Sequence, residues 1–345
     1  MQSQNEKKIS KKKFIEEITK LNTKDLRQRY EKILKEKKDI EISNKTKITK
    51  KQLIILLSDL IYKKNSNIKI KSKKNPENGL ILLQQGKRDN MEDTYTIWFH
   101  DDLKLYAVFD GHGGEEVSEF LTNILPKKIY QNIDLFLVNY RDTNIIEQLI
   151  NKIFISIDNE IKNLNLESGS TCVATLQIKD HLYIINLGDS RGILYYYNVN
   201  SKGYKIGKLK VQHITDDHKP DNASEFQYIK QAGGRVEYDK EDESYRVDGY
   251  LAMSRAFGDF DLKYSGNLEF NGPVSVKPDI YHTKLHKNRK YYIILASDGL
   301  WDEISNKRCL GYLDKFDTKI GCQYLMRESL EKSWDNITIL TAILK

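Results

Sequence analysis

Cysteine is scarce in this chain of 345 residues, and the cysteines that it has lie far apart. Cys172, Cys309 and Cys322 form no CxxC pair, and an odd number of cysteines without a secretory signal argues against a disulfide framework. A reducing compartment is therefore favoured. We expect the three side chains to be ordinary apolar or surface residues.

Long apolar runs are also missing. The N-terminus carries charges where the apolar core of a secretory signal would lie, and the longest run, Leu53 to Tyr62, is interrupted by Ser58 and Asp59. We therefore expect no membrane span. The chain is 39% hydrophobic and long enough to bury a core, so it should be globular over most of its length.

The positive charge is distributed unevenly along the chain. Residues 1–75 hold 23 Lys or Arg and 9 Asp or Glu; subtraction from the totals of 56 and 49 leaves 33 basic and 40 acidic residues. The composition changes near Lys71 to Gly79, where lysines, asparagines and Pro76 resemble a linker. We predict a basic, lysine-rich helical extension and linker over 1–75 and a folded domain over 76–345.

Apolar residues recur at helical spacing in the basic segment, around Phe14 to Leu21, Leu26 to Leu34 and Gln52 to Tyr62. Two or three short basic helices result. Such helices could bind nucleic acid, and they are similar to a small helix-extension-helix module that binds DNA, although the connecting stretch is too long. We favour a solvated lysine-rich surface. The cytoplasm is the expected location, and lysine runs such as Lys11 to Lys13 leave the nucleus open.

From Leu80 onward the sequence consists of short strands separated by turns. Tight links such as Lys179-Asp180 predict antiparallel hairpins. Helical patterns cover 115–130, 143–164, 223–232 and 305–330. The predicted class is α+β with antiparallel sheets and covering helices. The predicted strands are 80–85, 94–100, 104–110, 170–178, 181–189, 192–199, 210–215, 250–253, 290–298 and 336–344.

The stretch LYAVFDGHGG, residues 105–114, is the centre of this pattern. Its apolar half predicts a fully buried strand, and Asp110 stands where that strand ends. The glycines that follow allow a tight turn, with His112 at its rim.

Acidic residues stand at the ends of several other predicted strands. Each alone is typical of a turn or a helix cap, but together they predict carboxylates that share one cleft. Crowded carboxylates repel one another and need bound cations. Because all the ligands are oxygens, Mg²⁺ or Mn²⁺ is favoured over zinc. The acids concerned are Glu92, Asp93, Asp110, Asp189, Asp298 and Asp335.

The sequence contains an ordered set of eight motifs, namely R88-x-x-M-E-D, Y-A-V-F-D-G-H-G-G, S168-G-S-T, N186-L-G-D-S-R, D217-H-K-P, G249-Y-L-A-M-S-R-A-F-G-D-F, L295-A-S-D-G-L-W-D and W334-D-N-I-T. This set resembles the metal-dependent protein serine/threonine phosphatases of type 2C. The resemblance covers roughly residues 79–345, and eight motifs in the right order are far more specific than any one alone. It implies two antiparallel β-sheets packed face to face with helices on both outer sides.

The resemblance also implies a centre of two Mg²⁺ or Mn²⁺ ions. Asp110 resembles the carboxylate that bridges both metals, and Gly111 the backbone carbonyl ligand of the second. Asp298 and Asp335 resemble the remaining ligands of the first. Hydrolysis would then proceed by direct attack of a metal-bridging water or hydroxide, without a phosphoenzyme.

Two further groups of acids complete the implied centre. Glu92 and Asp93 resemble the acids that hold the second metal, largely through its waters. Asp189, Asp298 and Asp302 match positions that form a weaker third site in some family members.

The residues that act on the substrate are also implied. Arg88 resembles the guanidinium that binds the phosphate, since a planar fork matches a phosphate bidentately. His112 resembles the general acid that protonates the leaving serine or threonine oxygen. Outside the motif, Arg88 would be expected to pair with Asp89, and Asp259 is expected to support the cleft instead of binding metal.

The predicted function is therefore hydrolysis of phosphoserine and phosphothreonine in partner proteins by a monomer without membrane contact. Three alternatives remain open. The chain could bind phosphoproteins without turnover, or act on nucleic acid through residues 1–75, which would make its affinity fall steeply with salt. A metal-dependent nuclease shares the two-metal chemistry but does not account for the ordered motifs.

Overall fold

The computed structural model describes residues 79–100, 102–263, 272–316 and 318–344, together with Lys20, Lys24, Asp25 and Gln28. The chain divides into two units, Met1–Lys71 and Ser72–Lys345. Lys24, Asp25 and Gln28 are helical, and the rest of the helices predicted within 1–75 lies outside the described residues. The basic extension and the predicted boundary after residue 75 therefore stay predictions.

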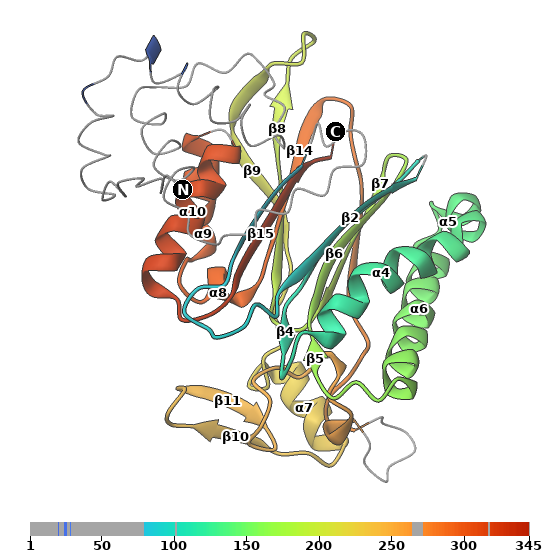
Figure 1. Ribbon diagram of the computed structural model, residues 1–345. Helices are drawn as coiled ribbons and strands as arrows, with labels where there is room; N and C mark the ends of the chain where they lie inside the picture. The colour runs from blue at the N-terminus through green and yellow to red at the C-terminus, as the bar shows by residue number, and fades with distance from the viewer. Residues whose placement is uncertain are drawn as a thin grey trace, which may run out of the picture. The chain divides into compact units, whose positions relative to one another are not determined.

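Two five-stranded antiparallel sheets form the centre of the second unit (Figure 1). The first sheet has the order β1-β15-β14-β8-β9, and its strands are Gly79–Gln84, Ile337–Ile343, Arg289–Ala296, Arg191–Val199 and Lys205–Ile214. The second has the order β13-β7-β6-β3-β2, and its strands are Asp279–Lys284, His181–Leu187, Cys172–Ile178, Leu103–Phe109 and Thr94–His100. The predicted hairpin at Lys179-Asp180 is confirmed, because Ile178 of β6 faces His181 of β7.

Strand β3 shows why the sheets pack face to face. Successive side chains of a strand point to opposite sides, and both sides of β3 are covered. Leu105 and Phe109 join the cluster under the helices, whereas Tyr106 and Val108 join the cluster shared by the two sheets. A strand buried on both faces reads as a continuous apolar run, which is the pattern predicted for residues 105–109.

Helices cover the outer face of each sheet (Figure 1). The second sheet is covered by α4 (Glu116–Gln131), α5 (Ile133–Asn139) and α6 (Thr143–Asn163). The first sheet is covered by α8 (Asp298–Trp301), α9 (Asn306–Lys315) and α10 (Thr318–Lys332). The predicted sandwich of two sheets between helices is therefore confirmed.

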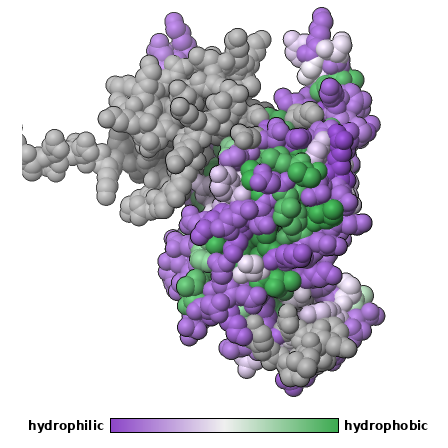
Figure 2. Space-filling model, turned by 90° about the vertical axis from the view of Figure 1, so that its right-hand side faces the viewer, coloured by the Kyte–Doolittle hydropathy of each residue, from purple (hydrophilic) through white to green (hydrophobic). Residues whose placement is uncertain are grey.

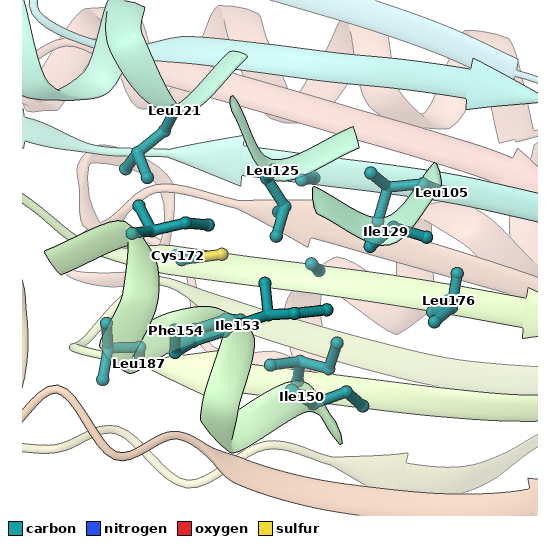
Figure 3. Close-up of a cluster of buried hydrophobic side chains, with 14 of the residues drawn as sticks. Leu105, Leu121, Leu125, Ile129, Ile150, Ile153, Phe154, Cys172, Leu176 and Leu187 are labelled. Carbon is teal, nitrogen blue, oxygen red and sulfur yellow. The ribbon is translucent and has the colours of Figure 1, made fainter. Parts of the chain in front are cut away.

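The apolar stripes of the helices form the larger part of the core. In α6, buried residues recur every three or four positions, which is the spacing of one helix face. Figure 3 shows side chains of α4 and α6 meeting those of the sheet, namely Leu121, Leu125, Ile129, Ile150, Ile153 and Phe154 with Leu105, Cys172, Leu176 and Leu187. All three cysteines are buried, as apolar residues would be.

Some local predictions were wrong. The segment 250–253 is not a strand, because Leu251 forms only an isolated bridge to Val247. The predicted helix 305–330 is two helices, α9 and α10, and the backbone of Phe316, which caps the end of α9, is extended. Helix α8 was not predicted, since four residues are too few for a clear apolar period. Strand β13 was not predicted, since its sequence DIYHTK is mostly polar.

Smaller elements gather at one end of the sheets (Figure 1). A three-stranded sheet contains β12 (Phe257–Gly258), β5 (Gly169–Ser170) and β4 (Gly111–His112), and η1 (Phe260–Leu262) follows β12. The segment 222–248 holds α7 (Ala223–Gln231), β10 (Val236–Asp239) and β11 (Ser244–Val247). Arg255 Nη2 lies 2.6 Å from Oε1 of the buried Glu225 in α7. This ion pair anchors α7 to the segment that precedes β12.

The surface that carries α5 and α6 is partly apolar. Figure 2 views this side of the molecule and shows hydrophobic residues gathered among hydrophilic ones. Leu135 and Val138 of α5 and Ile145 and Ile155 of α6 are exposed there. No helix within the described ranges is long and apolar enough to cross a membrane.

Candidate metal centre

The predicted acids lie at one edge of both sheets. In the second sheet, Thr94 faces Phe109, Val108 faces Val173, and Cys172 faces Leu187, so these strand ends lie side by side. Asp93 comes just before β2, Asp110 just after β3, and Asp189 shortly after β7. In the first sheet, Ala296 pairs with both Ile339 and Arg191. That register places Asp298 and Asp335 at the corresponding edge. Strand register therefore gathers acids that are widely separated in sequence.

Direct contacts join the acids of the two sheets. The Ser297 hydroxyl donates to Asp93 Oδ2 at 2.7 Å, and the backbone N–H of Asp298 points to Asp110 Oδ2 at 3.5 Å. Ser297 and Asp298 belong to the first sheet's edge, whereas Asp93 and Asp110 belong to the second. We call Asp93, Asp110, Asp189, Asp298, Asp302 and Asp335 the acid cluster.

Burial and mutual repulsion shift the acid cluster's proton affinities. Burial, followed by the charges of Asp298, Asp93 and Asp189, raises the pKa of Asp110 well above its usual value. Burial and then Asp189 and Asp302 raise the pKa of Asp298 well above its usual value. The pKa of Asp93, which is 2% exposed, rises to about 6, mainly through burial. The cluster therefore holds more negative charge than the protein around it can stabilise easily.

Metal-stripped protein is expected to lose stability as the pH rises from about 4 to 7. The pKa of Asp93 is about 6 in the folded chain, compared with 3.8 for an ordinary aspartate in the unfolded chain, so the folded chain holds this proton more tightly. The resulting stabilisation is complete below the unfolded pKa and is lost as the pH rises through the folded one; for Asp93 it is about 3 kcal/mol. Calorimetric melting temperatures across this range test the expectation, and an unchanged value would contradict the raised pKa values.

The donor set fits hard divalent cations. Every predicted ligand is an oxygen, and one carboxylate oxygen of Asp93 and one of Asp189 are buried without a hydrogen-bond partner in the described residues. Among those residues, no three His, Cys, Asp or Glu side chains are gathered closely enough to hold a metal ion as they stand. The acids thus converge on one edge, while the exact ligand set stays a prediction.

Gly111 and Glu92 are held by the backbone around the cluster. A Cβ on Gly111 would lie 2.5 Å from the Glu92 carbonyl oxygen and 2.9 Å from Ser118 Oγ, so only glycine fits there. The Glu92 N–H donates to Asn336 Oδ1 at 2.7 Å. The two backbone segments predicted to serve the second metal therefore pack against each other.

Arg88 pairs with an acid of the cluster and not with Asp89. Its Nη2 lies 2.7 Å from Asp335 Oδ2, and its side chain is 61% exposed. Burial opposes the charged form, but Asp335, Asp298 and Asp110 together raise the pKa of Arg88. The guanidinium is thus an exposed positive charge at the rim of a negative site.

His112 is oriented by Asp259, a partner that the sequence did not identify. His112 Nε2 lies 3.0 Å and 2.8 Å from the two carboxylate oxygens of Asp259. Burial of the ring lowers the pKa of His112, but the charge and hydrogen bond of Asp259, together with the charges of Asp189 and Glu92, raise it overall. Asp259 therefore supports the cleft, as expected, and it does so by holding the protonated form of His112.

Lys219 is a second residue whose role near the acid cluster was not predicted from the motifs. Its ammonium forms an ion pair with Asp189. Asp189, Asp298 and Asp302 raise the pKa of Lys219 despite its burial. A cation at the predicted third site would have to compete with this ammonium. The only sequence signal was its place in the D217-H-K-P motif.

Comparison with known proteins identifies the family of this chain. The family model for protein phosphatase 2C matches residues 83–321. Protein phosphatase 1L of Bos taurus is 34% identical over 268 residues, covering 74% of this chain and 69% of its own length. Protein phosphatase 1B of Homo sapiens is 32% identical over 293 residues, covering 76% of this chain and 57% of its own length.

A solved structure supports the same assignment. The serine-threonine phosphatase 2C from Toxoplasma gondii superposes with a TM-score of 0.64 at 26% identity, covering 77% of this chain and 94% of that one. The family model spans more than half of the chain, and the matched region contains most of the acid cluster. This chain therefore belongs to the protein phosphatase 2C family, the metal-dependent protein serine/threonine phosphatases.

Proposed function

We propose that this metal-dependent protein serine/threonine phosphatase hydrolyses phosphoserine and phosphothreonine at the acid cluster, with two Mg²⁺ or Mn²⁺ ions. The observation that carries the proposal is the convergence of acids from both sheets on one edge, where they raise one another's pKa. Divalent cations would relieve this repulsion, because each brings two positive charges to a site that holds several negative ones.

The division of ligands follows the motif positions. Asp110 would serve both cations, Asp298 and Asp335 the first, and the Gly111 carbonyl the second. Glu92 and Asp93 would hold the second cation through its water molecules. When bound, the cations would supply a nucleophilic water at neutral pH and stabilise charge on the phosphoryl oxygens.

A third, weaker cation is proposed at Asp189, Asp298 and Asp302. Lys219 already neutralises Asp189, so this cation would gain less than the first two. The positive charge of Lys219 also lies close enough to Asp302 to stabilise its ionised form.

Arg88 would bind the substrate phosphate. Its guanidinium is exposed and keeps donors available beyond the single bond to Asp335. The phosphate would thus be held between Arg88 and the cations, with its phosphorus positioned over the acid cluster.

Replacing Arg88 by Lys is expected to raise KM for a phosphothreonine peptide about tenfold and to change kcat less. Lysine keeps the charge but loses the planar fork that matches two phosphate oxygens. Steady-state kinetics with saturating Mn²⁺ test this expectation. Arg327→Lys, on the exposed face of α10, is the matched control, and equal KM values for Arg88→Lys and wild type would contradict the role.

His112 would protonate the leaving serine or threonine oxygen. Asp259 raises the pKa of His112, which favours the protonated ring that could release its proton when the ester bond breaks. The imidazolium is held in place by two contacts to one carboxylate, which fixes its orientation.

The test is phosphate release from a phosphothreonine peptide by metal-stripped protein titrated with Mn²⁺ or Mg²⁺. Turnover that requires the metal and disappears in Asp298→Asn supports the proposal. A folded, metal-loaded protein without turnover would favour the silent binding protein. The family findings do not favour that alternative or the nucleic-acid one, and the proposed role of residues 1–75 in nucleic-acid binding stays a prediction.

A further inference from the structure

An exposed tryptophan stands beside the proposed phosphate-binding arginine. Trp334 is 73% exposed, although tryptophan is one of the most apolar side chains. It directly precedes Asp335, whose carboxylate binds Arg88 at 2.7 Å. Lys87, the neighbour of Arg88, places its Nζ 4.3 Å from the centroid of the Trp334 ring. We call Lys87, Arg88, Trp334 and Asp335 the Trp334 shelf.

The two loops of the Trp334 shelf are locked together. Gly86 has a φ of +66°, and a Cβ there would lie 2.0 Å from the Asp335 carbonyl oxygen, so the loops touch backbone to backbone. Asn336, which is 5% exposed, donates to the carbonyls of Gln85 at 2.8 Å and Asn90 at 2.9 Å. The ring of Trp334 is therefore presented from a rigid base, and its exposure is not that of a loose loop.

Lys87 orients the ring as well. A cation over an indole face is attracted by the ring's negative quadrupole, and the contact occupies that face. The remaining surface of the ring stays open, as its exposed fraction shows. A large, rigid aromatic group with little entropy to lose is the kind of residue that dominates binding energy at interfaces.

We propose that Trp334 is a specificity-determining residue that binds an apolar side chain of the phosphoprotein substrate within two residues of the phosphorylated one. The inference rests on the proposed role of Arg88. A phosphate on Arg88 brings the flanking residues of an extended peptide past the neighbouring Trp334, since each residue advances about 3.3 Å. The substrate class is thus phosphothreonine or phosphoserine segments with an adjacent aromatic or aliphatic side chain.

The test compares phosphothreonine peptides that differ only at the flanking positions. Full-length, Mn²⁺-loaded wild type is expected to prefer Phe or Leu over Ala there by about threefold to tenfold in kcat/KM, mainly through KM. Trp334→Ala should lose this preference, so that kcat/KM for the Phe and Leu peptides falls to that for the Ala peptide, whereas Trp334→Phe should retain most of it. Tyr204→Ala removes another exposed aromatic ring, at the far end of the sheets, and should change nothing.

The outcomes separate this inference from the proposed function. If the alanine peptide is not hydrolysed by any variant, the proposed function fails. If it is hydrolysed and Trp334→Ala retains the wild-type preference, or slows all peptides equally, the inference is overturned. Circular dichroism of each variant confirms that it is folded.

Discussion

Asp298→Asn is expected to lower kcat/KM for a phosphothreonine peptide by at least about 10³-fold, because it removes a proposed anionic ligand from a centre that would supply several kcal/mol of charge stabilisation. The asparagine amide keeps the size of the side chain, so the fold should be unaffected. Turnover is measured at saturating Mn²⁺, and the affinity for Mn²⁺ is measured separately by calorimetry.

The same substitution is expected to raise the melting temperature of the metal-stripped protein. The pKa of Asp298 lies well above its usual value, so ionising this carboxylate at neutral pH costs folding free energy. A neutral amide removes that cost and also relieves Asp110. A variant that loses activity and gains stability would show that the repulsion between these carboxylates, which destabilises the fold, is needed for catalysis.

Asp134→Asn is the matched control. Asp134 lies exposed in the first turn of α5 and should affect neither activity nor melting temperature. An Asp298→Asn protein that keeps wild-type turnover would remove this carboxylate from the ligand set. An Asp298→Asn protein that melts at a lower temperature without metal would contradict the account of repulsion in the acid cluster.

His112→Ala is expected to lower kcat by about 10²- to 10⁴-fold with little change in Mn²⁺ affinity. The loss should be large for phosphothreonine peptides, whose alkoxide leaving group needs a proton. It should be much smaller for p-nitrophenyl phosphate, whose leaving group is stable without one. Loss of metal binding in place of slow turnover would overturn the assignment.

Asp259→Asn distinguishes a positioned acid from a merely buried histidine. Because the Asp259 charge raises the pKa of His112, its removal should lower that pKa. The protonated form would then be lost at a lower pH, so the alkaline limb of the kcat profile should shift to lower pH. An unchanged alkaline limb would show that His112 does not supply the proton.

Prediction from sequence succeeded where the signal was local. Strand β3 is an apolar run because both of its faces are buried, and α6 has an apolar stripe because one of its faces is buried. Each pattern can be seen within a single segment of the sequence. The segment 250–253 failed because its apolar residues pack beside α7 and need no strand partner. Helix α8 was missed because four residues carry no period.

The sequence alone predicts that the acids stand at strand ends, which class of cation they favour, and the order of the motifs, since turns and strand ends are set by nearby residues. The sequence alone does not predict the partners of the functional groups. His112 and Asp259 are 147 positions apart, and Arg88 and Asp335 are 247 apart. Contacts of this kind depend on which strands neighbour each other and in which register, and that depends on packing the whole sandwich. The tertiary structure alone therefore selected Asp259 as the partner of His112, Lys219 as the counter-charge of Asp189, and Trp334 as the partner of Lys87 beside Arg88.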